Sequence, residues 1–190
     1  MPHPHLVRTL AELDRILAGA TAAQFNVKPS AGKWSACDIL EHLDKTYSST
    51  ARLFEKILEN GELRVRPLTI KQRVTQLVVV GLGHMPRGLE APGLTVPTGA
   101  PADEVLVRVR ADFIRMAERH AQLAERYGRR RIAQHLVLGA LNADGWAKFH
   151  WVHSRHHFGQ IDRLLTLWTR GEMPAVAATY RSGGPDRDAN

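Results

Sequence analysis

Four long stretches of this chain repeat apolar residues at intervals of three and four, the spacing that keeps side chains on one face of an α-helix. They run over about residues 4–19, 35–61, 101–127 and 142–170. The alternating pattern of β-strands is weak in comparison. The sequence therefore predicts an all-α protein. Four helices of this length, with one long crossover between the second and the third, fit a four-helix bundle.

The residues at the edges of these stretches mark where the helices begin. Ser35, followed by Asp38, matches a capping box, and Asn142 is a favourable N-cap for the last helix. The crossover over residues 62–99 is rich in proline and glycine and contains one short amphipathic piece at about 70–80. A connection this long is expected either to cover a site or to form a mobile loop.

The 190 residues are enough for one substantial domain. We expect a single bundle domain over residues 1–170 and a disordered tail over 171–190, where glycine, proline, arginine and aspartate dominate. The single cysteine, Cys37, excludes an intrachain disulfide framework and fits a reducing cytoplasm. Because no apolar run approaches about 18 residues and the first residues lack a signal-peptide pattern, we expect a cytoplasmic protein without a membrane partner.

The chain is basic, with a formal net charge of +7. A basic chain can bind nucleic acid, but such binding needs the charges to gather on one face or in a recognised module. Here the basic residues are scattered, and the densest cluster is Arg129-Arg130-Arg131. The sequence therefore does not favour a nucleic-acid partner.

The most distinctive motif lies in the last predicted helix, where histidines recur at helical spacing. His150, His153 and His157 share one helical face, and Gln160 lies one turn further on. The apolar residues on the same face are Trp146, Ile161, Leu164 and Trp168. These imidazoles should therefore point into the core, where an unpartnered polar group is costly. A metal ion would be an economical partner for them.

The spacing of the histidines predicts three metal ligands, His42, His153 and His157. His153 and His157 are four residues apart, which lets two imidazoles of one helix bind the same ion. His42, beside the apolar stripe of the second helix, is the best candidate for the third. Three neutral imidazoles leave one position open, as in catalytic zinc sites. Imidazoles suit zinc, nickel, copper and iron, and a divalent zinc or nickel ion is our first expectation.

Three further side chains are candidates for the pocket or for the layer around the ligands. Gln160 either hydrogen-bonds a ligand imidazole or a metal-bound water, or is an ordinary buried amide. His150 either lines the pocket or packs in the core. His120 interrupts the apolar stripe of the third helix and is by default a hydrogen-bonded core histidine, with a pocket role as the alternative. No catalytic residue is assigned, because no Ser-His-Asp or Cys-His arrangement is evident.

In these motifs the chain resembles the DinB-like, YfiT-like superfamily of metal-binding four-helix-bundle proteins. The matching residues are Trp34-Ser35 followed by Leu40-Glu41-His42-Leu43, and the run from His153 to Ile161. A closer resemblance is to a branch known only as a domain of unknown function, and it rests on His135, Gly139, Leu141, Trp146, His150, His153, the pair His156-His157 and Gln160. Leu136 departs from that branch, which often has proline there.

The resemblance covers roughly residues 5–170 and implies a DinB-like bundle with one long crossover between helices 2 and 3. It places the family's metal ligands at His42, His153 and His157, and it implies that the protein is a homodimer, as members often are. Characterised relatives use a divalent metal to activate a low-molecular-weight thiol, in S-transferase or isomerase reactions.

Two functions stay open at this point. The first is a metal-dependent thiol S-transferase that acts on a small-molecule substrate, with a low-molecular-weight thiol as co-substrate. Because no general base is identifiable, a thiol transferase fits better than a hydrolase, by analogy with the family. The alternative is a non-catalytic, stress-related metal-binding protein in which the ion mainly stabilises the bundle.

Overall fold

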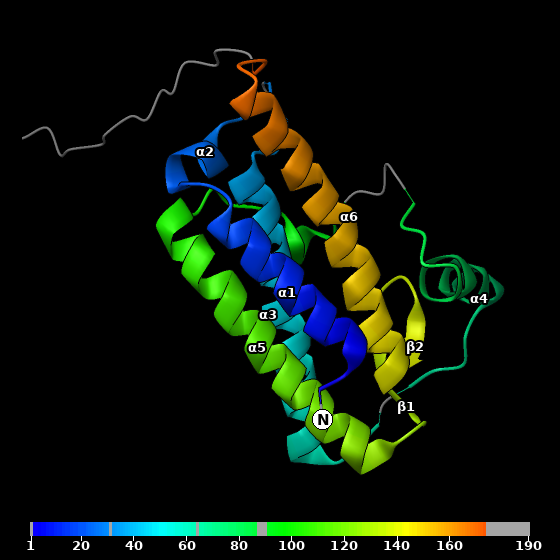
Figure 1. The fold of residues 1–190 in the computed structure, drawn as a ribbon. Helices are drawn as coiled ribbons and strands as arrows, with labels where there is room; N and C mark the ends of the chain where they lie inside the picture. The colour runs from blue at the N-terminus through cyan, green and yellow to red at the C-terminus, as the bar shows by residue number, and fades with distance from the viewer. Residues whose placement is uncertain (1, 31, 64, 87–90, 174–190) are drawn as a thin grey trace, which may run out of the picture.

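The computed structural model describes residues 2–30, 32–63, 65–86 and 91–173. Four long helices lie side by side (Figure 1), and they are α1 (Pro4–Ala18), α3 (Ala36–Asn60), α5 (Ala102–Tyr127) and α6 (Ala143–Thr169). The helix α3 packs along α5, and α1 packs along α6. The mostly helical fold predicted from the apolar spacing is confirmed, with the long helices at nearly their predicted bounds.

The hydrophobic core lies between these four helices. Tyr47 of α3 meets Phe113 of α5 edge to face, with ring centroids 5.0 Å apart. Leu13 of α1 and Ile161 of α6 are also fully buried. The predicted capping box is present, because the Ser35 hydroxyl accepts from the backbone of Asp38 and the Asp38 carboxylate accepts from the backbone of Ser35.

The crossover between α3 and α5 contains more regular structure than its composition suggests. It holds α4 (Ile70–Gln76), the π-helical turn η1 (Leu77–Gly81) and the 3-10 turn η2 (Gly93–Thr95). The short helix at about 70–80 that the sequence predicts is therefore present. A further short helix, α2 (Ala22–Asn26), follows α1 and was not predicted. Figure 1 shows α4 standing beside the main body, on the side of α6.

A β-hairpin between α5 and α6 is the main departure from the predicted all-helical chain. Its strands are β1 (Arg131–His135) and β2 (Gly139–Asn142), paired antiparallel. Gly139 has a φ of 75°, and a Cβ there would come within 2.8 Å of Gln72 Oε1 in α4. Glycine is therefore required where the hairpin turns under the crossover.

The C-terminal tail and membrane-spanning helices were also subjects of prediction. Of the disordered tail expected over residues 171–190, all but the first three residues lie outside the described part. Within the described residues, no helix combines the length and apolar character needed to cross a membrane.

Candidate metal centre

Two helices bring the three predicted ligands together. His42 lies on α3, and His153 and His157 lie one turn apart on α6. One nitrogen from each ring lies within 4.8 Å of the other two. The three side chains are only 4, 6 and 8 % exposed, respectively. The helical spacing that predicted an inward-facing pair on α6 is thus realised, and His42 faces that pair from across the core.

The ring nitrogens that meet are all Nε2 atoms. His153 Nε2 lies 3.2 Å from His42 Nε2 and 3.2 Å from His157 Nε2. In a tetrahedral site with metal–nitrogen distances of about 2.0–2.1 Å, ligand nitrogens lie about 3.3 Å apart. The two distances from His153 Nε2 are therefore close to those around a small divalent ion.

The opposite edges of two rings determine where their protons lie. His42 Nδ1 is 2.9 Å from the backbone oxygen of Thr95, and His157 Nδ1 is 2.7 Å from Gln160 Oε1. A carbonyl oxygen can only accept, so in the neutral rings both Nδ1 atoms carry the proton and both Nε2 atoms present a lone pair. These are the outer partners that fix the tautomer and orientation of metal-binding histidines.

The three rings do not satisfy one another without a shared cation. One proton on His153 Nε2 can be donated to either His42 or His157, but not to both. The other 3.2 Å contact then has no proton directed along it, and if His153 carries its proton on Nδ1, both contacts set two lone pairs face to face. His153 Nδ1 is buried and has no hydrogen-bond partner among the described residues. The donor set therefore fits a metal ion better than it fits a hydrogen-bonded histidine cluster.

Burial also prepares the three rings to bind a cation. It lowers the pKa of His157 to about 3, with the neighbouring His42 adding to the effect. Burial is likewise the main cause that lowers the pKa of His42 and of His153. All three imidazoles are therefore neutral at neutral pH, which is the protonation state that a metal requires.

A cavity of about 460 Å³ opens beside the triad, and all three imidazoles line it. Its walls come from α3, α6, the hairpin and both ends of the crossover, through side chains such as Trp34, Thr46, Val79, Leu94, Leu138 and Phe149. An ion held by three imidazoles would therefore have its fourth position facing a space large enough for a small molecule. The described part of the crossover contributes lining residues to this cavity, among them Thr75, Val79 and Leu94.

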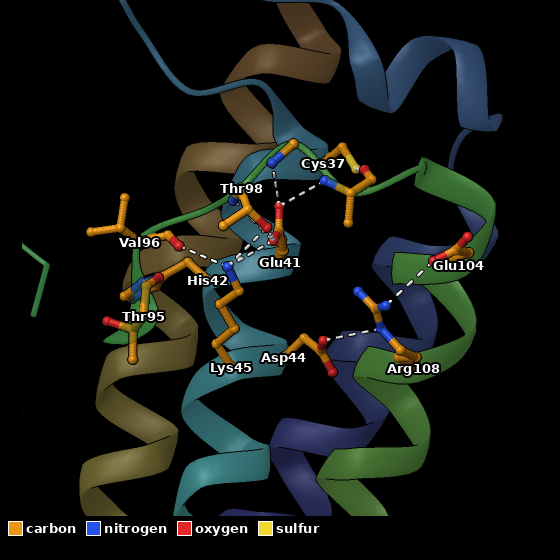
Figure 2. A network of polar contacts seen from close by, with 12 residues as sticks. Cys37, Glu41, His42, Asp44, Lys45, Thr95, Val96, Thr98, Glu104 and Arg108 are labelled. Atoms are coloured by element: carbon orange, nitrogen blue, oxygen red, sulfur yellow. Dashed lines mark hydrogen bonds and ion pairs between the residues drawn. The ribbon is translucent and has the colours of Figure 1, made fainter. Parts of the chain in front are cut away.

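The C-terminal end of the crossover is held on α3 by a buried carboxylate (Figure 2). Glu41, which is 1 % exposed, accepts from the backbone N–H groups of Thr98, Gly99 and Ala100 and from the Thr98 hydroxyl, at 2.7 to 3.1 Å. Lys45 pairs with the same carboxylate at 2.8 Å and donates to the Val96 carbonyl. These contacts fix the segment whose Thr95 oxygen holds His42.

The Glu41 carboxylate is strongly stabilised in its ionised form. Burial raises its pKa, but the hydrogen bonds from Lys45, Thr98 and Ala100 outweigh burial and lower the pKa to about 2. The ionised form is therefore the one that holds the crossover on α3. The sequence motif included Glu41 only as a neighbour of His42, and its role was missed because the donors lie more than fifty residues away.

The part of the crossover around α4 and η1 is held by α6 and the hairpin. Lys148 donates to the Gly81 carbonyl, and Arg155 donates to the Gly83 carbonyl at 2.7 Å. Gln76 of α4 donates to two hairpin carbonyls, those of Leu138 and Ala140. The crossover is therefore tied to the elements that carry the ligands.

The remaining candidates lie around the triad in different ways. Gln160 hydrogen-bonds the ligand imidazole of His157, which is the first of its two predicted roles. His120 is a buried core histidine whose Nε2 donates to the Ala143 carbonyl at 2.8 Å. His150 is fully buried and stacks on Trp146, with ring centroids 5.9 Å apart, and it does not line the cavity. The packing alternatives therefore describe His120 and His150.

Two further residues complete the comparison with the sequence analysis. Cys37 is buried, and burial raises the pKa of its thiol to about 11, so it is not a nucleophile at neutral pH. His135, at the end of β1, lines the cavity, and its Nδ1 accepts from the backbone N–H groups of Val137 and Leu138. His135 thereby closes the hairpin turn, a role that no local pattern signals.

The fold and the site together define a mostly helical protein with a buried histidine triad that could hold a metal ion. Comparison with protein families matches residues 5–161 to the DinB superfamily. The chain belongs to this superfamily. Comparisons with curated proteins and with solved structures gave no match.

Proposed function

We propose that this protein binds one divalent metal ion, zinc or nickel, through His42, His153 and His157 and uses it to activate a low-molecular-weight thiol for transfer to a small molecule. The proposal takes the four long helices as a DinB-type four-helix bundle whose crossover covers the metal centre. One observation carries it, which is that the three imidazoles come together at the wall of a cavity, so that an ion held by them would have one side facing that cavity.

A divalent ion held there would lower the pKa of a thiol in the open position, so that the thiol reacts as a thiolate. The sulfur then forms a bond to an electrophilic carbon of the second substrate as the bond from that carbon to its leaving group breaks. The leaving group departs with the bonding electron pair, and the thiol proton passes to solvent. The protein orients the ligands through the Thr95 carbonyl and Gln160. Phe149, stacked on His153 with ring centroids 5.4 Å apart, keeps that side of the site dry.

Elemental analysis of the purified, untagged protein tests the metal centre. We expect close to one equivalent of a divalent metal in the parent protein and little in His153→Ala, because two imidazoles hold an ion far less tightly than three. His84→Ala, which removes an exposed histidine on the crossover, is the control and should keep the metal. A parent protein that holds no metal even after reconstitution would contradict the proposal. Thiol consumption by the loaded protein then tests the reaction.

A non-catalytic metal-binding protein is the second candidate. No Asp, Glu, Lys or Arg is among the described residues that line the cavity, so no charged general base faces the site. In this case chelation would lower the melting temperature, and a panel of thiols and electrophiles would show no turnover. Turnover that requires the triad would exclude this candidate.

Homodimerisation is also part of the proposal. Ile70, Val74 and Leu77 form an apolar stripe along α4 and η1 and are 83, 57 and 61 % exposed. Such a stripe on one helical face is suited to packing against a second copy. Light scattering should give the dimer mass for the parent protein and the monomer mass for Val74→Lys. A monomeric parent would contradict this part of the proposal.

A further inference from the structure

The described residues that line the cavity beside the triad include no Lys, Arg, Asp or Glu. In the metal-free protein, a buried charge on a ligand would therefore find no charged partner among them. Burying an ionised group without a partner costs more free energy than burying an unpaired polar group. In the metal-free protein, this lining therefore disfavours carboxylate, phosphate and ammonium groups on a bound ligand.

The hydroxyl groups of the cavity are all oriented in the same sense. Each of them donates its proton to a backbone carbonyl three or four residues earlier, at 2.8 to 3.0 Å. A carbonyl can only accept, so the hydroxyl proton is used and the oxygen presents its lone pairs to the cavity. The residues concerned are Thr46, Ser49, Thr50, Thr75 and Thr95.

Three of these hydroxyls form one wall of the cavity. They belong to Thr46, Ser49 and Thr50, which lie on the cavity face of α3, beginning one turn after His42. At about 1.5 Å of rise per residue, this wall of acceptors extends from about 6 to about 12 Å beyond the metal ligand. A hydrogen-bond donor on the ligand would find its partners there.

We infer that the cavity takes an uncharged, largely apolar molecule that carries an O–H or N–H group, with this donor directed at the hydroxyl oxygens of α3. The inference deepens the proposed function, on which it rests, by naming the class of the small-molecule substrate. The apolar body packs between Val79, Leu94 and Phe149, and the reacting end faces the triad. A volume of about 460 Å³ fits a molecule of one or two rings.

Fluorescence titration with two matched probes tests this ligand class. N-phenyl-1-naphthylamine is neutral, has one N–H donor and brightens in apolar sites, and 8-anilino-1-naphthalenesulfonate is the same skeleton with a sulfonate. We expect the neutral probe to bind at least about tenfold more tightly in the metal-free protein, where no ion faces the cavity. Ser49→Trp, which fills the half-buried wall position, should abolish binding and so locate it.

A second arm tests the hydrogen bond to α3. Thr50→Val keeps the shape of the side chain and removes its oxygen. It should weaken binding of N-phenyl-1-naphthylamine about fivefold and leave binding of its N-methylated analogue, which has no N–H group, unchanged. Thr166→Val removes an equivalent hydroxyl on an exposed part of α6 and is the control. Ser49→Ala gives the same information if Thr50→Val does not fold.

The outcomes separate this inference from the proposed function. Two outcomes would overturn the inferred ligand class. The first is that the sulfonate binds as tightly as the neutral probe, or more tightly, at the position blocked by Ser49→Trp. The second is that both Thr50→Val and Ser49→Ala bind the neutral probe as tightly as the parent protein does. Failure of both probes to bind the folded protein would also overturn it. A protein that prefers the neutral probe but holds no metal would sink the proposed function and leave the ligand class standing.

Discussion

At the scale of single residues, Gln160 hydrogen-bonds His157, one of the three proposed metal ligands. Its Oε1 holds the proton of His157 Nδ1 at 2.7 Å, so the Nε2 lone pair faces the other two rings. Gln160→Leu removes this acceptor, and we expect metal affinity to fall by about 10–100-fold. Competition with a chelator of known affinity measures the change.

The matched variant for this prediction is Gln160→Glu, which keeps an acceptor oxygen next to His157. It should retain at least the parent affinity, because a carboxylate accepts the same proton and raises the basicity of the ring. Equal affinity in the Leu and Glu variants would show that Gln160 only packs beside the ligand.

The sequence predicted the triad because its chemistry is local and periodic. His153 and His157 are one turn apart on a helix whose apolar face is clear, so their burial follows from the spacing alone. His42 follows a capping box that fixes the phase of its helix. The partners on the other side of the rings were harder to predict. The Thr95 oxygen reaches His42 through a backbone contact, which leaves no trace in residue type.

At the scale of elements, the Glu41 carboxylate holds residues 98–100 against α3 (Figure 2). Glu41→Gln replaces one acceptor oxygen by an amide that faces backbone donors. We expect a loss of stability on the order of 3 kcal/mol at pH 7, from the fall in its pKa to about 2. The metal should also bind more weakly, because the segment that carries Thr95 is loosened. Urea unfolding and chelator competition measure the two effects.

The pH dependence of this loss has a definite sign. A carboxyl whose pKa is lowered on folding stabilises the protein above its ordinary pKa of 4.5 and stops doing so as the pH falls towards about 2. The difference between parent and Glu41→Gln should therefore shrink below pH 4.5. Glu104→Gln, at an exposed ion pair with Arg108, is the control and should change stability by less than about 0.5 kcal/mol. A similar loss in both variants would contradict the special role of Glu41.

The elements that the sequence did not predict are those that depend on contacts across the fold. The hairpin turn after His135 has the apolar residues Leu136 and Val137 instead of the usual Asn-Gly signal. It forms because His135 caps the turn and because Gln76 of α4 holds the hairpin carbonyls. The regular structure of the crossover was also hard to predict from its sequence. It depends on hydrogen bonds from Lys148 and Arg155 on α6, which lie far away along the chain.

At the scale of the whole molecule, buried neutral histidines make the metal-free protein sensitive to acid. Burial lowers the pKa of His135 to about 4 and those of His150 and His157 to about 3, below the ordinary value of 6.5. In the unfolded chain these rings take up protons as the pH falls through 6.5, but in the folded chain they do not. The unfolded state therefore binds more protons, and stability falls as the pH drops from about 6.5 towards 4.

The slope of this loss is the most general test of the described core. Three such rings contribute at most about 4 kcal/mol per pH unit to the free energy of unfolding. His150 offers the clearest variant, because neither of its ring nitrogens has a hydrogen-bond partner among the described residues and it does not line the cavity. His150→Phe keeps a flat ring against Trp146 and removes one proton-binding site. We expect the slope between pH 6.5 and pH 5 to fall by about 1.1 kcal/mol per unit on average, because the unfolded ring is only half protonated at pH 6.5.

Urea unfolding of metal-free protein at several pH values measures this slope. His84→Gln, at an exposed position on the crossover, is the control and should leave the slope at the parent value. An unchanged slope in His150→Phe would mean that this ring is charged or solvated in the folded protein, which its complete burial opposes.

Adding the divalent metal should shift the acid transition of the parent to lower pH, because the ion competes with protons for the three triad nitrogens. The same shift should be absent from His153→Ala, so acid stability gives a measure of the metal centre that needs no knowledge of the reaction.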